Sequence, residues 1–173
     1  MSPRAPAANV AATILVRKLQ EDALAQRQTL NTILAAGLTA GVLDILAAFV
    51  INLEIGPVRV LQAVASGVLG VASYDGGPAT AALGLALHLL IALAAAGVYV
   101  LAASRLPLIN ARAVQCGILF GLLMFAVMQY VIVPVSAAAI GPPTMAGTIK
   151  QMLAHAFLFG LPIGLITRRM LKG

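Results

Sequence analysis

Three ionisable side chains lie inside long apolar stretches of the chain, where such residues are rare. Asp44 lies in the run LNTILAAGLTAGVLDILAAFV (30–50), and His88 and His155 lie in two later runs of similar character. An ionised aspartate at the centre of a membrane helix costs about 2.5–3.5 kcal/mol on insertion scales, so it indicates a functional site or a buried partner. Histidine accepts a proton near neutral pH, and its neutral ring binds metal ions. These residue types predict an intramembrane site that binds or translocates a proton, a small solute or a metal ion.

The three residues reach a similar depth in the helices that we expect. At 1.5 Å per residue, each lies about 20 Å from the cytoplasmic end of its helix, within a hydrocarbon core about 30 Å thick. We expect Asp44 and His88 to lie within reach of each other, directly or through one water, and leave open whether His155 joins them. The predicted binding residues are Asp44, His88, Gln129, Tyr130 and His155, and the candidate metal ligands are His88, His155, Asp44 and Met128.

A structural role is the alternative explanation for each of these side chains. Either histidine could be a hydrogen-bonded packing residue, and Asp44 could be protonated or paired with His88 in a purely structural network. Methionine is flexible and fills gaps between helices, so Met124 and Met128 are typical packing residues. The sequence leaves both explanations open and assigns no cofactor.

The composition places the chain in a membrane. The 173 residues are 61% hydrophobic and only 9% charged, with a mean hydropathy of +1.02, whereas a soluble domain is about 25% charged. The lipid bilayer is therefore the expected surrounding. The net charge of +6 is better explained by basic cytoplasmic loops than by nucleic-acid binding. Cys116 is the only cysteine, so the chain has no internal disulfide and no CxxC site.

The predicted fold class is all-α: a polytopic membrane protein with four transmembrane helices. Residues 1–28 are expected to form a cytoplasmic N-terminal tail with an amphipathic helix, on the membrane surface or against a partner. Residues 29–173 form the transmembrane domain. Residues 58–73 make a short external helix, interfacial or re-entrant, because the uncharged run is too short for a typical span. The four spans are expected at about 30–51, 79–103, 113–135 and 151–167.

The distribution of lysine and arginine supports this layout over one with five spans. Four spans with a cytoplasmic N-terminus place nine basic residues inside and leave only Arg59 and Lys150 outside. A fifth span at 58–73 would leave five inside and six outside. Because cytoplasmic loops carry the excess of basic residues, both termini are predicted to be cytoplasmic.

Small residues mark the faces on which the spans are expected to pack. Glycines four residues apart let membrane helices approach closely. At about 100° per residue, Asp44 lies within about 60° of Gly37 and Gly41 and so belongs to the packed face. His155 lies roughly opposite Gly164, so either the fourth span packs on two sides or His155 faces a different neighbour. The glycine pairs are Gly37 with Gly41, Gly117 with Gly121, and Gly160 with Gly164, and the second span offers Ala81, Gly84, Ala92 and Ala95.

Four segments of the chain resemble a group of small bacterial inner-membrane proteins, the YagU-like proteins. The segments are GPVRVLQAVASGVLG, GGPATAALGLALHLLIALAAAGVYV, VMQYVIVPVSA and HAFLFGLPIGLITRR. The resemblance covers about residues 37–169, and its motifs are loose and apolar. It implies four transmembrane helices and an inner-membrane location, and it carries no catalytic role.

Three functions follow as hypotheses. The first is the polar site of Asp44, His88 and His155, in a homo-oligomer if it transports, because four helices are few for a pathway. The second is an accessory or scaffold subunit, whose glycine faces and N-terminal helix bind a partner membrane protein. The third is a haem protein with His88 and His155 as ligands. The chain lacks a G-x-S-x-G motif, an H-E-x-x-H motif and a nucleotide-binding loop, which disfavours an enzyme.

Overall fold

The computed structural model describes residues 5–141 and 144–171, and within them it contains helices and no strands. Five of the helical segments are long and apolar enough to cross a membrane, and they carry large apolar side chains on their outer surfaces. The chain therefore has the character of an integral membrane protein. The elements are α1 (Ala5–Ile51), α2 (Gly56–Leu69), η1 (Gly70–Tyr74), α3 (Gly77–Arg105), α4 (Pro107–Ala111), α5 (Ala113–Val127), η2 (Met128–Ile132), α6 (Val133–Val135), α7 (Met145–Ala154), η3 (His155–Gly160) and α8 (Leu161–Leu171).

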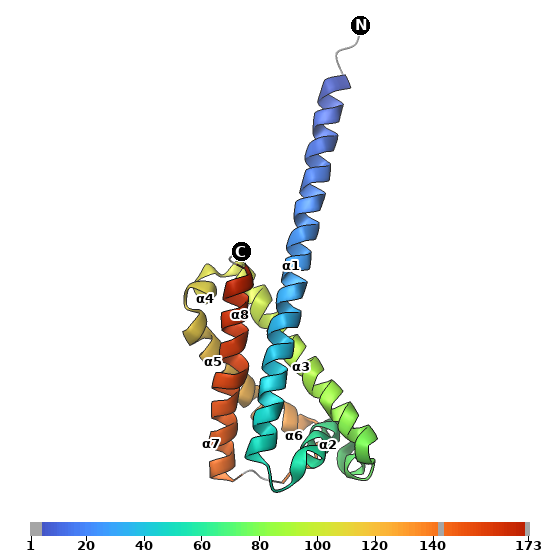
Figure 1. Cartoon of the computed structure of the whole chain (residues 1–173), viewed down its shortest axis with the longest axis vertical. Coiled ribbons are helices and arrows are strands. Elements are labelled where there is room, and N and C mark those ends of the chain that lie inside the picture. Colours follow the sequence, from blue (N-terminus) through green and yellow to red (C-terminus); the bar gives the residue numbers. More distant parts are fainter. Residues whose placement is uncertain (1–4, 142–143, 172–173) are drawn as a thin grey trace.

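Helix α1 is the central element of the bundle. It packs against α3 on one side and against α7, η3 and α8 on another, while α5 packs mainly against η3 and α8. Figure 1 shows α4 and the C-terminal end together at the upper end of the bundle. The connection after α1, the short helix α2 and the start of α7 lie at the lower end.

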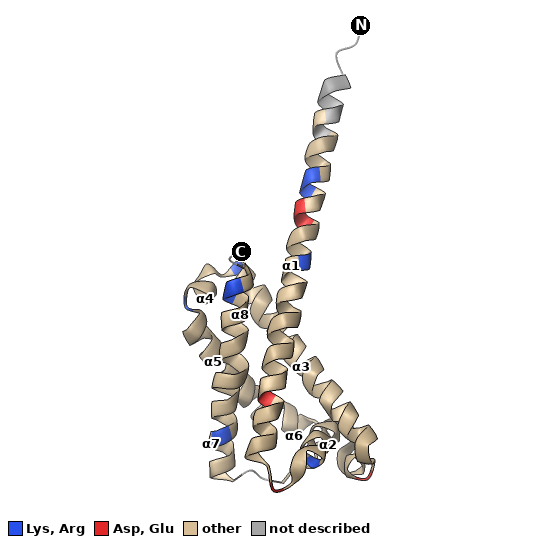
Figure 2. Ribbon diagram, viewed as in Figure 1, with Lys and Arg blue, Asp and Glu red and all other residues tan. Residues whose placement is uncertain are grey.

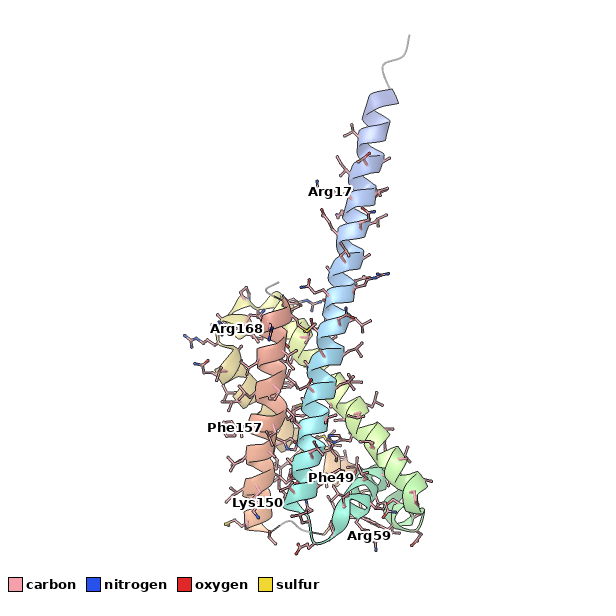
Figure 3. The ribbon with its side chains drawn as sticks, in the orientation of Figure 1. Arg17, Phe49, Arg59, Lys150, Phe157 and Arg168 are labelled. Atoms are coloured by element: carbon pink, nitrogen blue, oxygen red, sulfur yellow. The ribbon has the colours of Figure 1, made fainter. Side chains whose placement is uncertain are left out.

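Lysine and arginine side chains avoid the middle of the bundle. Figure 2 shows lysine and arginine near the two ends and on the upper part of α1. In Figure 3, Arg59 and Lys150 lie at the lower end and Arg168 near the upper end, whereas Phe157 points outward at mid-height. The only acidic residue between Asp22 and Glu54 is Asp44. An apolar middle with charged ends is the arrangement that a bilayer requires.

The first helix is longer than the sequence predicted. We expected a separate amphipathic helix at 9–28 followed by a span at 30–51, but α1 runs without a break from Ala5 to Ile51. At 1.5 Å per residue, these 47 residues measure about 70 Å. The N-terminal part of α1 therefore projects beyond the bundle along the axis of the same helix (Figure 1).

Two of the long helices contain wide π-helical turns, η2 and η3. Each turn is followed by a proline two residues after its end, Pro134 after η2 and Pro162 after η3. Proline has no N–H to donate, and its ring clashes with the carbonyl four residues earlier. A widened turn before the proline relieves that clash and keeps the helix continuous.

The helix pairs that pack most closely do so through the predicted glycines. On α5, a Cβ atom at Gly121 would overlap the carbonyl oxygen of His155, and one at Gly117 would lie 2.8 Å from the carbonyl oxygen of Gly160. On α1, a Cβ atom at Gly37 would lie 2.9 Å from Cα of Leu93 in α3. Backbones approach this closely only where side chains are absent. The glycine faces are thus used for packing within the chain.

Helix α2 lies at the lower end of the molecule, between the end of α1 and the start of α3 (Figure 1). Gly56 and Gly77, which begin α2 and α3, have φ angles of 79° and 57°, values that favour glycine. The side-chain amide of Gln62 donates hydrogen bonds to the carbonyl of Gly77 and the hydroxyl of Thr80. These bonds fix α2 against the first turns of α3.

The segment 136–140 covers α2 from the other side. The backbone N–H of Ala137 donates to the carbonyl of Gly67 at 3.1 Å, and the N–H of Ala139 donates to Oγ of Ser66 at 3.2 Å. The hydroxyl of Tyr74 donates to the carbonyl of Ala139 at 3.0 Å. The connection between α6 and α7 is therefore fastened to α2 and η1 at the lower end of the bundle.

The glycine packing predicts that Gly121→Ala destabilises the protein. The added methyl group meets the backbone at His155, which cannot move as a side chain can, and overpacking of this kind costs about 1–3 kcal/mol. The free energy of unfolding, measured by titration with a denaturing detergent, should fall by that amount. Gly141→Ala is the control, because nothing lies within 4 Å of the added Cβ there. Equal stability of the two variants would contradict the observed packing.

Candidate site at Asp44 and His155

Asp44 lies on the buried face of α1. The residue is only 7% exposed, and Ala40 and Ala48, one turn before and after it, are also buried. Its carboxylate atom Oδ1 is buried and has no hydrogen-bond partner among the described residues. A buried oxygen of this kind loses the free energy of hydration without replacing it. Either a positively charged neighbour or a bound proton would compensate for this lost hydration at Oδ1.

His155 supplies the nearest ionisable group. Its Nδ1 atom lies 3.4 Å from Oδ1 of Asp44, and the side chains are 16% and 9% exposed, respectively. The same Nδ1 atom lies 3.0 Å from the carbonyl oxygen of Gln151. A carbonyl oxygen only accepts, so Nδ1 carries a hydrogen in this contact. That hydrogen points towards Gln151. The carboxylate of Asp44 therefore lies close to the imidazole and interacts with it electrostatically, but it accepts no hydrogen bond from Nδ1.

Two aromatic rings enclose the imidazole of His155. The ring of Phe125 meets it edge to face, with centroids 5.7 Å apart, and the ring of Phe159 lies 5.8 Å away. Both phenylalanines are buried. Since apolar surroundings screen charge less than water does, the attraction between Asp44 and a protonated His155 is stronger here than at a surface.

His88 does not take the place that we predicted for it. Its Nε2 atom lies 2.9 Å from the carbonyl oxygen of Gly41, to which it must donate. The ionic partner of Asp44 is His155, and the described residues show no direct ion pair between Asp44 and His88. The expected direct pair is therefore corrected, whereas a contact between Asp44 and His88 through one water stays a prediction. The reason for the correction is the crossing of α1 and α3. It places Gly41 opposite His88, whereas Asp44 lies three residues later and about 60° further round α1, on the side that faces η3.

The π-helical turn explains why the direction of His155 was hard to predict. A regular helix places His155 and Gly164, nine residues apart, about 180° from each other. The turn η3 begins at His155 and inserts an additional residue between them, which reduces the angle to about 80°. Gly164 therefore packs against Ala113 of α5 while His155 reaches α1.

The remaining predicted residues lie around the site without joining its polar contacts. Tyr130 is 67% exposed and touches the site only through Phe125, whose ring centroid is 6.4 Å away. Gln129 and Met128 lie in η2 and are half-buried. Sequence reasoning missed the two phenylalanines that enclose His155. The signal was present in the four-residue spacing of His155 and Phe159.

The described residues contain no group of three histidine, cysteine, aspartate or glutamate side chains that could hold a metal ion. The candidate ligands His88 and His155 each contact a backbone carbonyl, on α1 and within α7 respectively. Nε2 of His88, which would face a haem iron, is occupied by that bond. The donor set therefore does not favour a metal ion or a haem at these residues.

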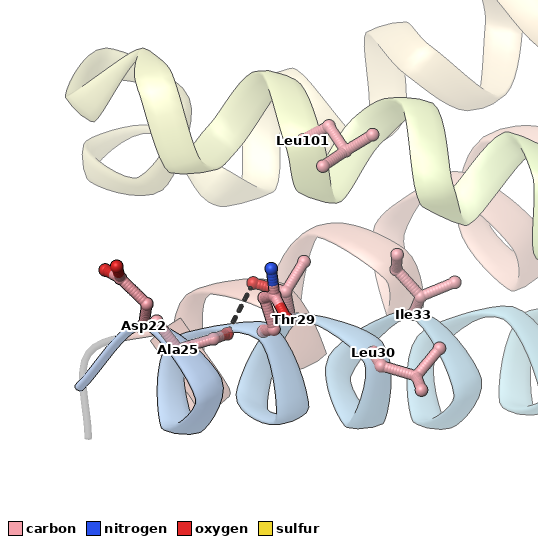
Figure 4. Close-up of a pocket in the computed structure, with 7 residues that line it drawn as sticks. Asp22, Ala25, Thr29, Leu30, Ile33 and Leu101 are labelled. Carbon is pink, nitrogen blue, oxygen red and sulfur yellow. Dashed lines mark hydrogen bonds between the residues drawn. The ribbon is translucent and has the colours of Figure 1, made fainter. Parts of the chain in front are cut away.

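A separate groove of about 500 Å³ lies where α1 leaves the bundle. Figure 4 shows it between α1 and Leu101 of α3, with the hydroxyl of Thr29 bonded back to the carbonyl of Ala25 at 2.9 Å. Asp44, His88 and His155 do not line it. The lining residues are Asp22, Ala25, Gln26, Thr29, Leu30, Ile33 and Leu101.

Comparison with known proteins finds no matching family model, no similar characterised protein and no similar solved structure. The function must therefore be inferred from the geometry of this chain.

The contact between Asp44 and His155 predicts a coupling free energy between the two residues. Asp44→Asn, His155→Gln and the double variant should be non-additive in stability, by about 0.6 kcal/mol and up to about 1.7 kcal/mol, the range for polar pairs between membrane helices. His88→Gln serves as the matched histidine control. Paired with Asp44→Asn, it should be additive within about 0.3–0.5 kcal/mol. Stronger coupling of Asp44 to His88 than to His155 would contradict the observed contact.

Proposed function

We propose that this chain is an integral membrane protein whose Asp44–His155 pair binds a proton inside the helix bundle. The observation that carries the proposal is the buried, unbonded Oδ1 atom of Asp44 with an imidazole nitrogen 3.4 Å away. Intramembrane ionisable residues mark proton relays and ion pathways in pumps and transporters.

A proton fits this site better than the other ligands considered for it. A metal ion requires several donor groups, and a small solute requires a cavity with placed polar groups. A proton needs only one acceptor, and the site offers two: Oδ1 of Asp44 and the second ring nitrogen of His155, Nε2. When bound, it either neutralises Asp44 or makes His155 a cation beside it, and both outcomes satisfy the buried oxygen. Phe125 and Phe159 cover part of the imidazole and leave its side chain only 16% exposed.

The proposed topology has four crossing segments: α1, α3, α5 to α6, and α7 to α8. Helix α2 would lie in the outer leaflet, where the connection 136–140 fastens it to the bundle. The excess of basic residues at the opposite end supports cytoplasmic termini. We also propose that the chain resembles the YagU-like proteins and lies, as they do, in the inner membrane of a bacterium.

A non-catalytic scaffold subunit is the second candidate. The projecting part of α1 favours it, because this helix carries exposed apolar residues, such as Val16 and Leu19, outside the bundle. The glycine faces do not support it. Gly117, Gly121 and Gly160 are already in close contact within the chain, so they are not available to a partner protein.

The topology predicts that Asp75 and Arg169 lie on opposite sides of the membrane. Single cysteines at these positions, in a Cys116→Ser background, should react with an impermeant thiol reagent from opposite sides in sealed vesicles. Both residues are exposed, so access does not limit the reaction. Labelling of both positions from the same side would overturn the four-crossing layout.

The proton-binding proposal is tested by infrared difference spectroscopy of the reconstituted protein between pH 5 and pH 8, the range in which histidine changes charge. We expect carboxyl bands that are lost in Asp44→Asn and altered in His155→Gln. Glu54→Gln removes an exposed carboxylate and should leave these bands in place. A difference spectrum unchanged by Asp44→Asn would refute proton binding at this residue.

A further inference from the structure

The projecting part of α1 carries a second pattern that the bundle does not use. Exposed residues follow one another at alternating spacings of four and three, the period of a coiled-coil seam. With the seam positions called a and d, the a residues are Val16, Ala23 and Leu30, and the d residues are Ala12, Leu19 and Gln26. All six are exposed in this single chain, including Val16 at 54% and Leu19 at 59%.

The charged residues of this helix lie away from the seam. Arg17, Lys18 and Glu21 occupy the outer positions of the repeat, and Arg17 and Glu21 pair within the helix at 2.9 Å. The other apolar residues nearby, such as Val10 and Ile14, belong to a face that this ion pair interrupts. Leu15 and Leu24 are also exposed, at 59% and 65%, and lie outside the seam. Charged residues opposite an apolar seam are nevertheless the pattern of a two-stranded coiled coil.

We propose that the projecting part of α1 pairs with the same segment of a second copy of this chain, as a parallel two-stranded coiled coil. Copies inserted in a membrane in one orientation present α1 from the same face, so the two helices are parallel and in register. Val16 at an a position and Leu19 at a d position are the choice that favours two parallel strands. The proposal does not depend on proton binding at Asp44.

Charge complementarity supports a second copy as the occupant. In a parallel coiled coil, the residue before an a position meets the residue five places later on the other strand. Asp22 and Arg27 stand in this relation. Asp22 of each copy therefore lies beside Arg27 of the other, which gives two ion pairs across the seam. Both residues are exposed in the single chain.

The groove beside α1 gives a second, independent observation. Its lining includes the seam residues Gln26 and Leu30, and it opens between them and Leu101 of α3. Leu30 is 56% exposed, so the end of α3 does not cover the lower seam.

Oxidative crosslinking in membranes tests the proposal. In a Cys116→Ser background, Leu19→Cys should form a disulfide-linked dimer in most of the protein. Glu21→Cys, on the outer side of the same turn, should crosslink several-fold less. Both substitutions lie outside the bundle, so its folding is not at risk. Equal crosslinking at the two positions, or none at Leu19, would overturn the proposal in favour of a lipid surface or another protein as occupant.

Charge reversal provides a test of the register. Asp22→Arg and Arg27→Asp, made singly in the Leu19→Cys chain, each place like charges across the seam and should lower the crosslinked fraction. The double reversal should restore it, because the pairing is re-formed with opposite signs. Lys18→Asp changes the charge at an outer position and should have no effect. Failure of the double variant to recover would rule out this register.

Discussion

The structure depends on the close approach of α5 to η3 and α8 through glycine. Without side chains at Gly117, Gly121 and Gly160, the two backbones come into direct contact. Lipid tails are as apolar as leucine, so burial alone does not drive membrane helices together, and such packing contributes much of their association. The contact holds the backbone of His155 against α5, and the wide turn directs its side chain to α1. The polar site is therefore a consequence of the packing.

The two histidines show how similar residues acquire different roles in one bundle. His88 donates to the carbonyl of Gly41, and it thereby links α3 to α1. The absence of a side chain at Gly41 allows this approach, because a Cβ atom there would lie 2.9 Å from Cβ of Ala92. His155 contacts a carboxylate and is enclosed by aromatic rings. One histidine is thus a structural link, whereas the other belongs to a site with an unsatisfied oxygen.

Much of the architecture could be predicted from the sequence, because it follows from composition and local spacing. Apolar runs indicated helices of membrane length, and the glycine pairs marked the faces that pack. The buried position of Asp44 followed from its angle to Gly37 and Gly41. The partner of Asp44 could not be predicted, since the π-helical turn at His155 changes the rotation of the helix by a residue. The continuity of α1 through Gln28 was missed as well. The change from an amphipathic to an apolar pattern indicated a boundary there, but no glycine or proline lies at that point to end the helix.

The most direct test of this account is the distance between the carboxyl carbon of Asp44 and Nδ1 of His155 in lipid bilayers. Solid-state NMR measures it through the carbon–nitrogen dipolar coupling, and the chain has only two histidines, so His88→Gln leaves a single histidine signal. The account predicts a strong coupling to His155 that persists in His88→Gln. A coupling that disappears in His88→Gln, or no coupling in either protein, would contradict the Asp44–His155 pair.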